Sequence, residues 1–506
     1  MSESASSRRA LVIGAATNWA AFAATLAVAF FLAPYLVRTL GAPKYGAWCV
    51  AEGVLAYFTL FDLGIAACLV RFVARYAATG ETGARNRVVA SCFALFCAAG
   101  TAALLVGCAV TPFVAHGIER KLTDGAGEVL PFLLLMLANL AVTLPLSVFP
   151  NVLDGVQRFG AKSAVRLVAL AARVAGTVWV METMPGLLPL ALVFTATNLA
   201  EHALMAVLCY RLVPGFSLSL RNVDRASLRA VRGYSVDAFL AMLAGRVTVQ
   251  TGAIVAGGFV SLAAAAHYAL AARLVEMAKN LLRHVTTTLA PAVSAREAAG
   301  DLAGVRAVLL DGTRAVLYLV LPVHLGLLAF GAPFLDRWLG GPALAEACFP
   351  TTAILACALS LAVAQSVAAR VLYGLGKLKL FARAALCEAA LNLVLCFALV
   401  GDFGLVGIAV AVAVPNALFC AFTIAYSCRV LEVPVREYVR RCWLKPLCAA
   451  LAPAAVWWLL PATDPTWLSI ALGVCAGLGP YALAVLALEF APKRGEVRTA
   501  EARSAF

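Results

Sequence analysis

Residues 235–293 read SVDAFLAMLAGRVTVQTGAIVAGGFVSLAAAAHYALAARLVEMAKNLLRHVTTTLAPAV. This stretch is long and apolar enough for two membrane-spanning helices, one over residues 235–258 and one that starts near residue 262. It also carries charged side chains at depths where hydrocarbon would surround them. These charged residues are Arg246 in the first span and Arg273, Glu276, Lys279 and Arg283 in the second.

The polar residues of the second span share one side of a helix. At about 100° per residue, they fall within an arc of roughly 140° and extend for about 20 Å along the helix. These residues are Arg273, Glu276, Lys279, Asn280, Arg283, His284 and Thr287. A charge at membrane depth is costly unless it faces water, protein or a ligand. This side of the second span is therefore predicted to line a hydrated cavity. The cavity is the favoured interpretation for Arg273 and for Arg246 of the first span, which both lie deeper. For Arg283 and His284, the alternative is a solvated extension of the helix beyond the bilayer.

The composition of the chain is that of a polytopic membrane protein. Of the 506 residues, 63% are hydrophobic and 13% are charged, which excludes a soluble globular protein. The 15 cysteines lie almost entirely within apolar stretches and form no C-x-x-C pair, so we expect neither disulfides nor a metal site. There is no G-x-x-x-x-G-K-[ST] loop for a nucleotide, and we expect no cofactor.

We predict an all-α fold with about fourteen transmembrane helices. The predicted spans are 11–33, 46–68, 88–110, 130–150, 164–181, 187–208, 235–258, 262–290, 315–332, 348–369, 381–400, 404–426, 446–460 and 466–489. When Arg166 and Arg383, each the third residue of its span, are counted with the adjoining loops, 30 of the 40 Lys and Arg residues fall in loops on one side, five in loops on the other side, and five within spans. The positive-inside rule then places both termini in the cytoplasm. This distribution also explains the net charge of +14 without a nucleic-acid partner.

The sequence contains an internal repeat. VLDGVQRF at 152–159 resembles VLYGLGKL at 371–378, and Gly80-Glu81 corresponds to Gly300-Asp301 at nearly the same offset. Six spans per repeat in the same orientation predict two parallel lobes related by an axis along the membrane normal. The predicted division is an N-terminal lobe over 1–214, a C-terminal lobe over 215–432, two appended helices over 433–490 and a cytoplasmic tail over 491–506.

Several short motifs occur in the order and spacing found in a known family. The first half has FLAPYLVRTLG at 31–41, YGAW at 45–48, LFDLG at 60–64 and RFVAR at 71–75. The second half has LYGLGK at 372–377, LNLVL at 391–395 and FGLVGIA at 403–409. Residues 10–430 thereby resemble polysaccharide-biosynthesis flippases of the Wzx type, in the multidrug/oligosaccharidyl-lipid/polysaccharide exporter superfamily.

This resemblance implies two six-helix lobes around a central cavity that opens alternately to each side of a bacterial cytoplasmic (inner) membrane. It implies translocation of an undecaprenyl-diphosphate-linked oligosaccharide for O-antigen, lipopolysaccharide, capsule or exopolysaccharide synthesis, with coupling to an ion gradient. The expected partners are this lipid-linked substrate, membrane lipids, and polysaccharide polymerase and chain-length proteins. A cationic cavity suits such a substrate, because the guanidinium group of arginine can donate two hydrogen bonds to a diphosphate.

Six residues are the candidates for this chemistry. Arg173 lies about 14 Å into the fifth span, where it either lines the cavity or joins helices. Glu276 lies one turn from Arg273 and from Lys279, and it either balances these cations or acts as a proton-coupling carboxylate. The expected substrate-binding residues are Arg246, Arg273, Lys279, Arg283 and Arg173, with Glu276 for ion coupling and no catalytic residue.

Three other functions were weighed against the flippase. A membrane-bound polysaccharide polymerase or ligase would carry a large outer loop, and the longest one here covers only about residues 111–129. A multidrug cation exporter would usually have twelve spans and would avoid an arginine-rich lumen. A flippase for the peptidoglycan precursor would share the fold, and the sequence leaves it open. We therefore expect a transporter and not an enzyme.

Overall fold

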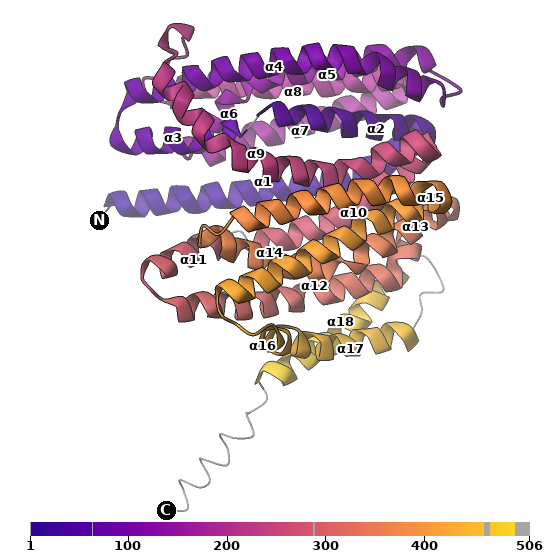
Figure 1. Cartoon of the computed structure of the whole chain (residues 1–506). Helices are drawn as coiled ribbons and strands as arrows, with labels where there is room; N and C mark the ends of the chain where they lie inside the picture. Colours follow the sequence, from indigo (N-terminus) through magenta and orange to yellow (C-terminus); the bar gives the residue numbers. More distant parts are fainter. Residues whose placement is uncertain (1, 63, 287–288, 460–465, 491–506) are drawn as a thin grey trace, which may run out of the picture. The chain divides into compact units, whose positions relative to one another are not determined.

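The computed structural model describes residues 2–62, 64–286, 289–459 and 466–490, and every regular element in these ranges is a helix (Figure 1). The predicted all-α fold is thus confirmed. The helices form two compact units. Unit 1 comprises the residues up to Leu270 together with Ala385–Ile408. Unit 2 comprises Ala271–Ala384 and the described residues from Ala409 onward.

Unit 1 contains the first half of the chain and the beginning of the second. Its helices are α1 (Ser2–Leu40), α2 (Ala42–Phe58), η1 (Thr59–Asp62), α3 (Ile65–Thr79), α4 (Thr82–Glu119), η2 (Ala126–Glu128), α5 (Val129–Leu146), α6 (Val148–Gly155), α7 (Phe159–Thr183), α8 (Leu187–Leu212), η3 (Leu220–Asn222), α9 (Arg225–Val255) and the π-helical η4 (Ala256–Val260). The first part of α10 (Leu262–Thr286) and the middle of α15 (Lys379–Val430) also belong to it.

Unit 2 contains the rest of α10 and of α15. Its other helices are α11 (Leu289–Ala298), α12 (Leu302–Leu339), α13 (Pro342–Cys357), α14 (Leu359–Gly374), α16 (Val435–Tyr438), the π-helical η5 (Val439–Trp443), α17 (Leu444–Leu459) and α18 (Trp467–Phe490). Several of its long helices contain proline, for example Pro322 and Pro333 in α12. Proline is tolerated in transmembrane helices because neighbouring groups satisfy the freed carbonyls.

The described residues contain fewer candidate membrane-crossing helices than the fourteen predicted spans. Among the described residues, eleven helices are long and apolar enough to cross a membrane, or twelve if Ala42–Asp62 and Ile65–Thr79, which bend by 44°, form one span. The predicted spans 381–400 and 404–426 lie together in the 52-residue α15, which is broken at Gly404 with φ of 53°. The predicted span 262–290 begins with α10, which is too rich in charged residues to be counted. Fourteen spans therefore stay a prediction.

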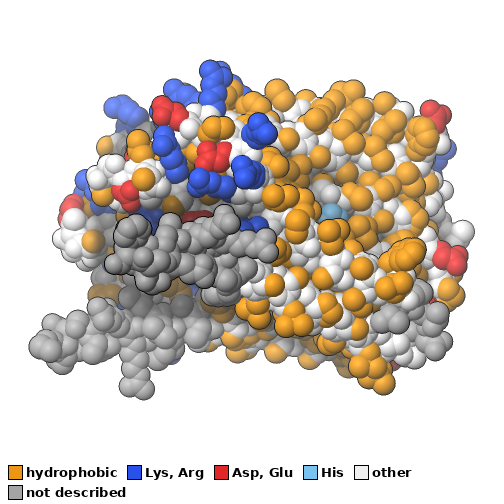
Figure 2. Space-filling model, turned by 90° about the horizontal axis from the view of Figure 1, so that it is seen from below, with side chains coloured by type: hydrophobic (Ala, Val, Ile, Leu, Met, Phe, Trp, Pro, Cys, Tyr) orange, Lys and Arg blue, Asp and Glu red, His pale blue; other side chains and the backbone are white. Residues whose placement is uncertain are grey.

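One face of the molecule shows the distribution of side chains expected in a bilayer. Hydrophobic side chains cover most of this face, while Lys and Arg side chains gather at one end of it (Figure 2). A broad apolar band with charged groups confined to its ends is what hydrocarbon requires of a protein surface. The described part of the chain is therefore that of a multi-pass membrane protein.

The internal repeat is confirmed by a pair of matching helix contacts. A Cβ atom at Gly155 of α6 would lie 2.6 Å from Cγ1 of Val73 and 3.1 Å from the carbonyl oxygen of Val70. In unit 2, a Cβ atom at Gly374 of α14 would lie 2.6 Å from Cγ1 of Val293, and 3.1 Å from the corresponding carbonyl oxygen in α11. Each unit thus has a glycine that allows two helices to approach closely.

The backbone turns of the two repeats also correspond. Gly80 and Gly300 end α3 and α11 with φ of 72° and 71°, and a 38-residue helix follows each of them. The turns after α6 and α14 place Gln157 and Gly376 at φ of 60° and 65°. These positions lie in the left-handed region, which favours glycine. The repeat read from short motifs is therefore a repeat of three-dimensional structure.

Both ends of α9 are held by side chains within unit 1. At its start, the Asp224 carboxylate accepts a hydrogen bond of 3.1 Å from the Ser227 amide. The backbone amides of Ala226 and Ser227 at this N-terminal cap lower the pKa of the aspartate below its usual range. Beyond its C-terminal end, Lys121 donates hydrogen bonds to the carbonyl oxygens of Gly257 at 2.8 Å and Gly258 at 2.5 Å. A cation at these unpaired carbonyls also favours the helix dipole.

The last two helices pack on α12 at both of their ends. At one end, the ring of Trp457 lies edge-on to Phe330 at 5.6 Å, and its indole N–H donates to the Gly473 carbonyl oxygen at 2.8 Å. At the other end, Glu489 of α18 accepts a hydrogen bond from the Tyr318 hydroxyl at 2.9 Å. Its carboxylate also pairs with cations from two other helices, namely Arg314 at 3.6 Å and Lys445 at 3.4 Å. Helices α17 and α18 are therefore integral to unit 2.

Candidate functional site

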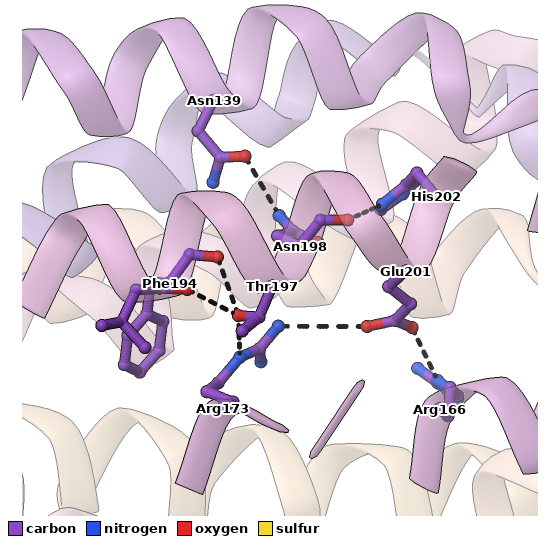
Figure 3. Close-up of polar contacts among 9 residues, drawn as sticks. Asn139, Arg166, Arg173, Phe194, Thr197, Asn198, Glu201 and His202 are labelled. Carbon is purple, nitrogen blue, oxygen red and sulfur yellow. Dashed lines mark hydrogen bonds and ion pairs between the residues drawn. The ribbon is translucent and has the colours of Figure 1, made fainter. Parts of the chain in front are cut away.

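A network of polar side chains lies between α7 and α8 of unit 1 and is centred on Arg173 (Figure 3). The guanidinium Nε of Arg173 donates a hydrogen bond to the Thr197 hydroxyl at 3.1 Å. The same guanidinium group lies over the ring of Phe194, 5.1 Å from its centroid, in a cation–π contact. The predicted candidate Arg173 is thus held on three sides by α8, because Glu201 contacts it as well.

Glu201 bridges two arginines of α7. Its carboxylate oxygens lie 3.9 Å from Nη2 of Arg173 and 3.8 Å from Nε of Arg166 (Figure 3). Side-chain exposure is 19% for Glu201 and 24% for Arg173, but 61% for Arg166, so the inner pair is the shielded one. The network holds two cations and one carboxylate. Arg173 of α7 thus contacts α8, and the cluster carries one positive charge in excess.

A second, neutral set of hydrogen bonds continues the network toward α5. The Asn198 side-chain amide donates to the side-chain oxygen of Asn139 at 3.3 Å, and the His202 ring Nδ1 donates to the Asn198 carbonyl at 2.9 Å (Figure 3). These amide and imidazole groups can donate or accept hydrogen bonds without adding charge. The site as a whole offers hydrogen bonds suited to hydroxylated or anionic groups.

Sequence reasoning missed most of the neutral members of this network, although a signal was present. Thr197, Asn198, Glu201 and His202 follow Phe194 at intervals that place them on one side of α8. An apolar helix that carries four polar residues on one side indicates a buried partner or a polar lumen. Asn139 gives no such signal, since it is the single amide of α5, whose other residues are apolar except for Thr143.

An aromatic cluster supports the network from the side of α2. The ring of Trp48 lies 4.9 Å from that of Phe194 and 5.4 Å from that of Phe132, and Trp48 is almost fully buried. The rings fix the position of Phe194, and thereby the surface against which the Arg173 guanidinium packs.

Arg246 differs from Arg173 in its pairing. It lies in α9 within the apolar segment Met242–Val260 and is half-buried. Among the residues whose side chains the structure describes, none forms a hydrogen bond or ion pair with it. Removing a guanidinium group from water without a counter-charge is costly. Arg246 is therefore the candidate with the greatest need of an anionic ligand.

The candidates of α10 lie in unit 2. Lys279 forms an ion pair with Glu276 at 3.4 Å, and both side chains are half-buried. This contact agrees with the reading of Glu276 as a residue that balances neighbouring cations. Arg273 is half-buried and makes polar contacts of its own. Arg283 belongs to α10, but its side chain and that of His284 lie outside the described residues.

All 15 cysteines are free. Among the described residues, no group of three or more His, Cys, Asp or Glu side chains is placed to hold a metal ion.

Comparisons with known proteins agree with the fold. The model of the family described as "Polysaccharide biosynthesis protein" matches residues 14–296. No curated protein sequence matches the chain.

Solved structures show the same architecture. The Lipid II flippase MurJ in an inward closed conformation has a TM-score of 0.68 and 12% identity, over 91% of this chain and 98% of that one. A multidrug resistance MATE family transporter of the MOP superfamily, in an inward-facing conformation, has a TM-score of 0.64 and 12% identity, over 80% and 94%. A MOP superfamily transporter from Pyrococcus furiosus has a TM-score of 0.57 and 13% identity, over 84% and 95%. These likenesses confirm the expected polytopic fold, which the chain shares with MOP-superfamily transporters.

Proposed function

Because the chain belongs to the polysaccharide biosynthesis protein family, whose fold is that of MOP-superfamily transporters, we propose that it is a flippase for an undecaprenyl-diphosphate-linked oligosaccharide. The chain is a transporter and not an enzyme. The glycan would serve the synthesis of O-antigen, capsule or exopolysaccharide. The membrane would be the bacterial cytoplasmic membrane, with both termini in the cytoplasm, as the distribution of Lys and Arg between the loops supports.

The observation that carries the proposal is Arg246. It is a half-buried cation in an apolar segment of α9, and no described side chain neutralises it. A diphosphate would supply the missing negative charge, and the planar guanidinium group can bind two of its oxygens at once. The prenyl chain needs no such site, since it can remain in lipid.

The remaining candidates take different parts in this proposal. In unit 2, Arg273, Lys279 and Arg283 would form a cationic surface of α10, with Glu276 reducing the charge of Lys279 and serving as the candidate for ion coupling. Arg173 would contribute through its network with Glu201, whose excess positive charge suits an anionic headgroup. Polysaccharide polymerase and chain-length proteins are the proposed protein partners.

A transport assay in reconstituted vesicles tests the role of Arg246. Charge-assisted hydrogen bonds contribute about 1.5–3 kcal/mol, so Arg246→Ala should slow transport of labelled lipid-linked oligosaccharide about 10- to 100-fold. Arg246→Lys should keep part of the activity, because it retains the charge but loses the planar fork. Arg229→Ala is the matched control, since Arg229 lies on the same helix and is exposed. Transport by Arg246→Ala at the rate of this control would overturn the proposal.

A flippase for the peptidoglycan precursor is the second candidate. The chain shares its fold with the Lipid II flippase MurJ and with a multidrug MATE transporter alike, and the cationic Arg246 favours a diphosphate lipid over a cationic drug. The same vesicles distinguish the two flippases when they are loaded in parallel with a peptidoglycan precursor and with a lipid-linked polysaccharide repeat unit. Faster transport of the peptidoglycan precursor would select the second candidate.

A further inference from the structure

One side of the segment 435–444, which precedes the apolar part of α17, packs against α12. The Tyr438 hydroxyl donates a hydrogen bond to the Thr313 hydroxyl at 3.5 Å, and the Cys442 thiol donates to the Leu310 carbonyl oxygen at 3.3 Å. Tyr438 and Cys442 are 1% and 0% exposed. The segment is therefore bound to α12 through one side and presents its other side outward.

The outward side carries an apolar stripe. Val435, Val439 and Leu444 are 48%, 51% and 56% exposed. The stripe continues along α17 with Leu447 and Leu451, which are also exposed. The candidate membrane span Val435–Leu459 begins with this segment, and the end of a span is where hydrocarbon meets the headgroups.

The cations around this segment divide into two groups. Most of them are neutralised by carboxylates: Arg441 by Glu437 at 3.0 Å, Lys445 by Glu489 at 3.4 Å, and Arg306 by Glu432 at 3.1 Å. By contrast, Arg436 and Arg440 are exposed, and no described side chain forms an ion pair or hydrogen bond with either of them.

Arg436 and Arg440 are spaced to act together. They lie four residues apart, so they are about one helical turn from each other on the same side. Each lies next to a residue of the apolar stripe, Val435 or Val439. The surface thus combines two unpaired guanidinium groups with exposed aliphatic side chains at a membrane boundary.

We propose that the outward side of residues 435–444 binds an anionic phospholipid. Arg436 and Arg440 bind the headgroup phosphate, and Val435, Val439 and Leu444 contact the upper part of the acyl chains. The arrangement suits a lipid better than a free anion, because free phosphate would leave the apolar stripe without a partner. This binding does not depend on which substrate the protein transports. It holds the start of α17 at the membrane surface.

Lipid retention by the purified full chain tests the proposal. Protein reconstituted with equal amounts of phosphatidylglycerol and phosphatidylcholine is extracted, washed and analysed by native mass spectrometry. The wild type should retain phosphatidylglycerol in preference to phosphatidylcholine. Each arginine near an anionic surface contributes about five-fold in affinity, so Arg436→Gln with Arg440→Gln should weaken retention about 25-fold.

The control pair is Arg441→Gln with Arg306→Gln, which removes the same number of positive charges from positions that are already paired. This pair should retain phosphatidylglycerol as the wild type does. Arg436→Lys with Arg440→Lys should keep most of the binding, which separates loss of charge from loss of structure. Equal retention of the two lipids by the wild type would overturn the proposal, as would unchanged retention by the glutamine pair. Displacement of the lipid by inorganic phosphate alone would also overturn it, since the site would then bind a free anion.

Discussion

Replacement of Gly155 by alanine tests the packing that the two repeats share. The new methyl group would lie 2.6 Å from Cγ1 of Val73 and 2.7 Å from its Cβ, far inside van der Waals contact. Val73 is fully buried and cannot rotate away, and the Val70 carbonyl oxygen at 3.1 Å blocks a shift in that direction. Helix α6 must therefore move away from α3.

The expected loss follows from this geometry. Overpacking a well-packed core costs about 1–3 kcal/mol. Alanine in place of glycine returns up to about 1 kcal/mol within a helix, but Gly155 is the last residue of α6, so this gain is small. We expect Gly155→Ala to lower the free energy of unfolding by about 1–2 kcal/mol. Gly374→Ala should have a similar effect against Val293, because the contact distances are the same.

The free energy of unfolding can be measured by titrating detergent-solubilised protein with dodecyl sulfate. Gly117→Ala is the matched control, since no atom lies within 4 Å of a Cβ atom at Gly117 in α4. A double-mutant cycle of Gly155→Ala with Val73→Ala should show a favourable coupling of about 0.5–3 kcal/mol, because the smaller side chain relieves the clash. Equal stability of the Gly155 and Gly117 variants, or a cycle without coupling, would refute the reasoning.

Three further changes probe other contacts. Glu489→Gln should lower the melting temperature and loosen α18, because it removes the carboxylate that pairs with both Arg314 and Lys445. Hydrogen exchange in α18 should rise, whereas a purely apolar attachment would leave it unchanged. Lys121→Met should leave the Gly257 carbonyl oxygen without its hydrogen-bond donor and expose it. A cysteine placed in the adjacent turn should then react faster with an impermeant thiol reagent, and an unchanged rate would contradict the capping role of Lys121. The Asp224 carboxylate has a lowered pKa in the folded state, so its stabilising effect is complete above the ordinary aspartate pKa of about 3.9 and is lost as the pH falls through the lower folded value. Amide protection at the start of α9 should decline over that range in the wild type and stay level in Asp224→Asn; parallel curves would refute this assignment.

The sequence was sufficient for the fold wherever a pattern repeats along the chain. Apolar stretches of span length predicted the helices, and the match between residues 152–159 and 371–378 predicted the repeat. The break between two predicted spans lies in α15, where Gly404 takes a left-handed φ within an otherwise continuous helix. The position of this break could be predicted from the glycine and from the length of the apolar stretch, which is enough for two spans.

Pairing could not be read from the sequence, because it joins residues that are distant along the chain. Arg173 and Glu201 are 28 positions apart on two antiparallel neighbours, and only the packing of α7 on α8 brings them together. The Glu276–Lys279 pair could be foreseen, since its members are one helical turn apart. Only the three-dimensional structure therefore shows whether a cation at membrane depth has a carboxylate partner. Arg173 has such a partner in Glu201, whereas no described side chain pairs with Arg246.

The division of the chain between the two units has a consequence for biogenesis. Unit 1 is not complete when its first 270 residues have been made, because it also includes Ala385–Ile408. Synthesis at 5–20 residues per second means that this segment leaves the ribosome roughly 7–28 s after Leu270. The early helices must wait in the bilayer during that time, in contact with lipids or with the insertion machinery. Variants within 385–408 should therefore impair maturation of the N-terminal half, although the ribosome finished that half long before.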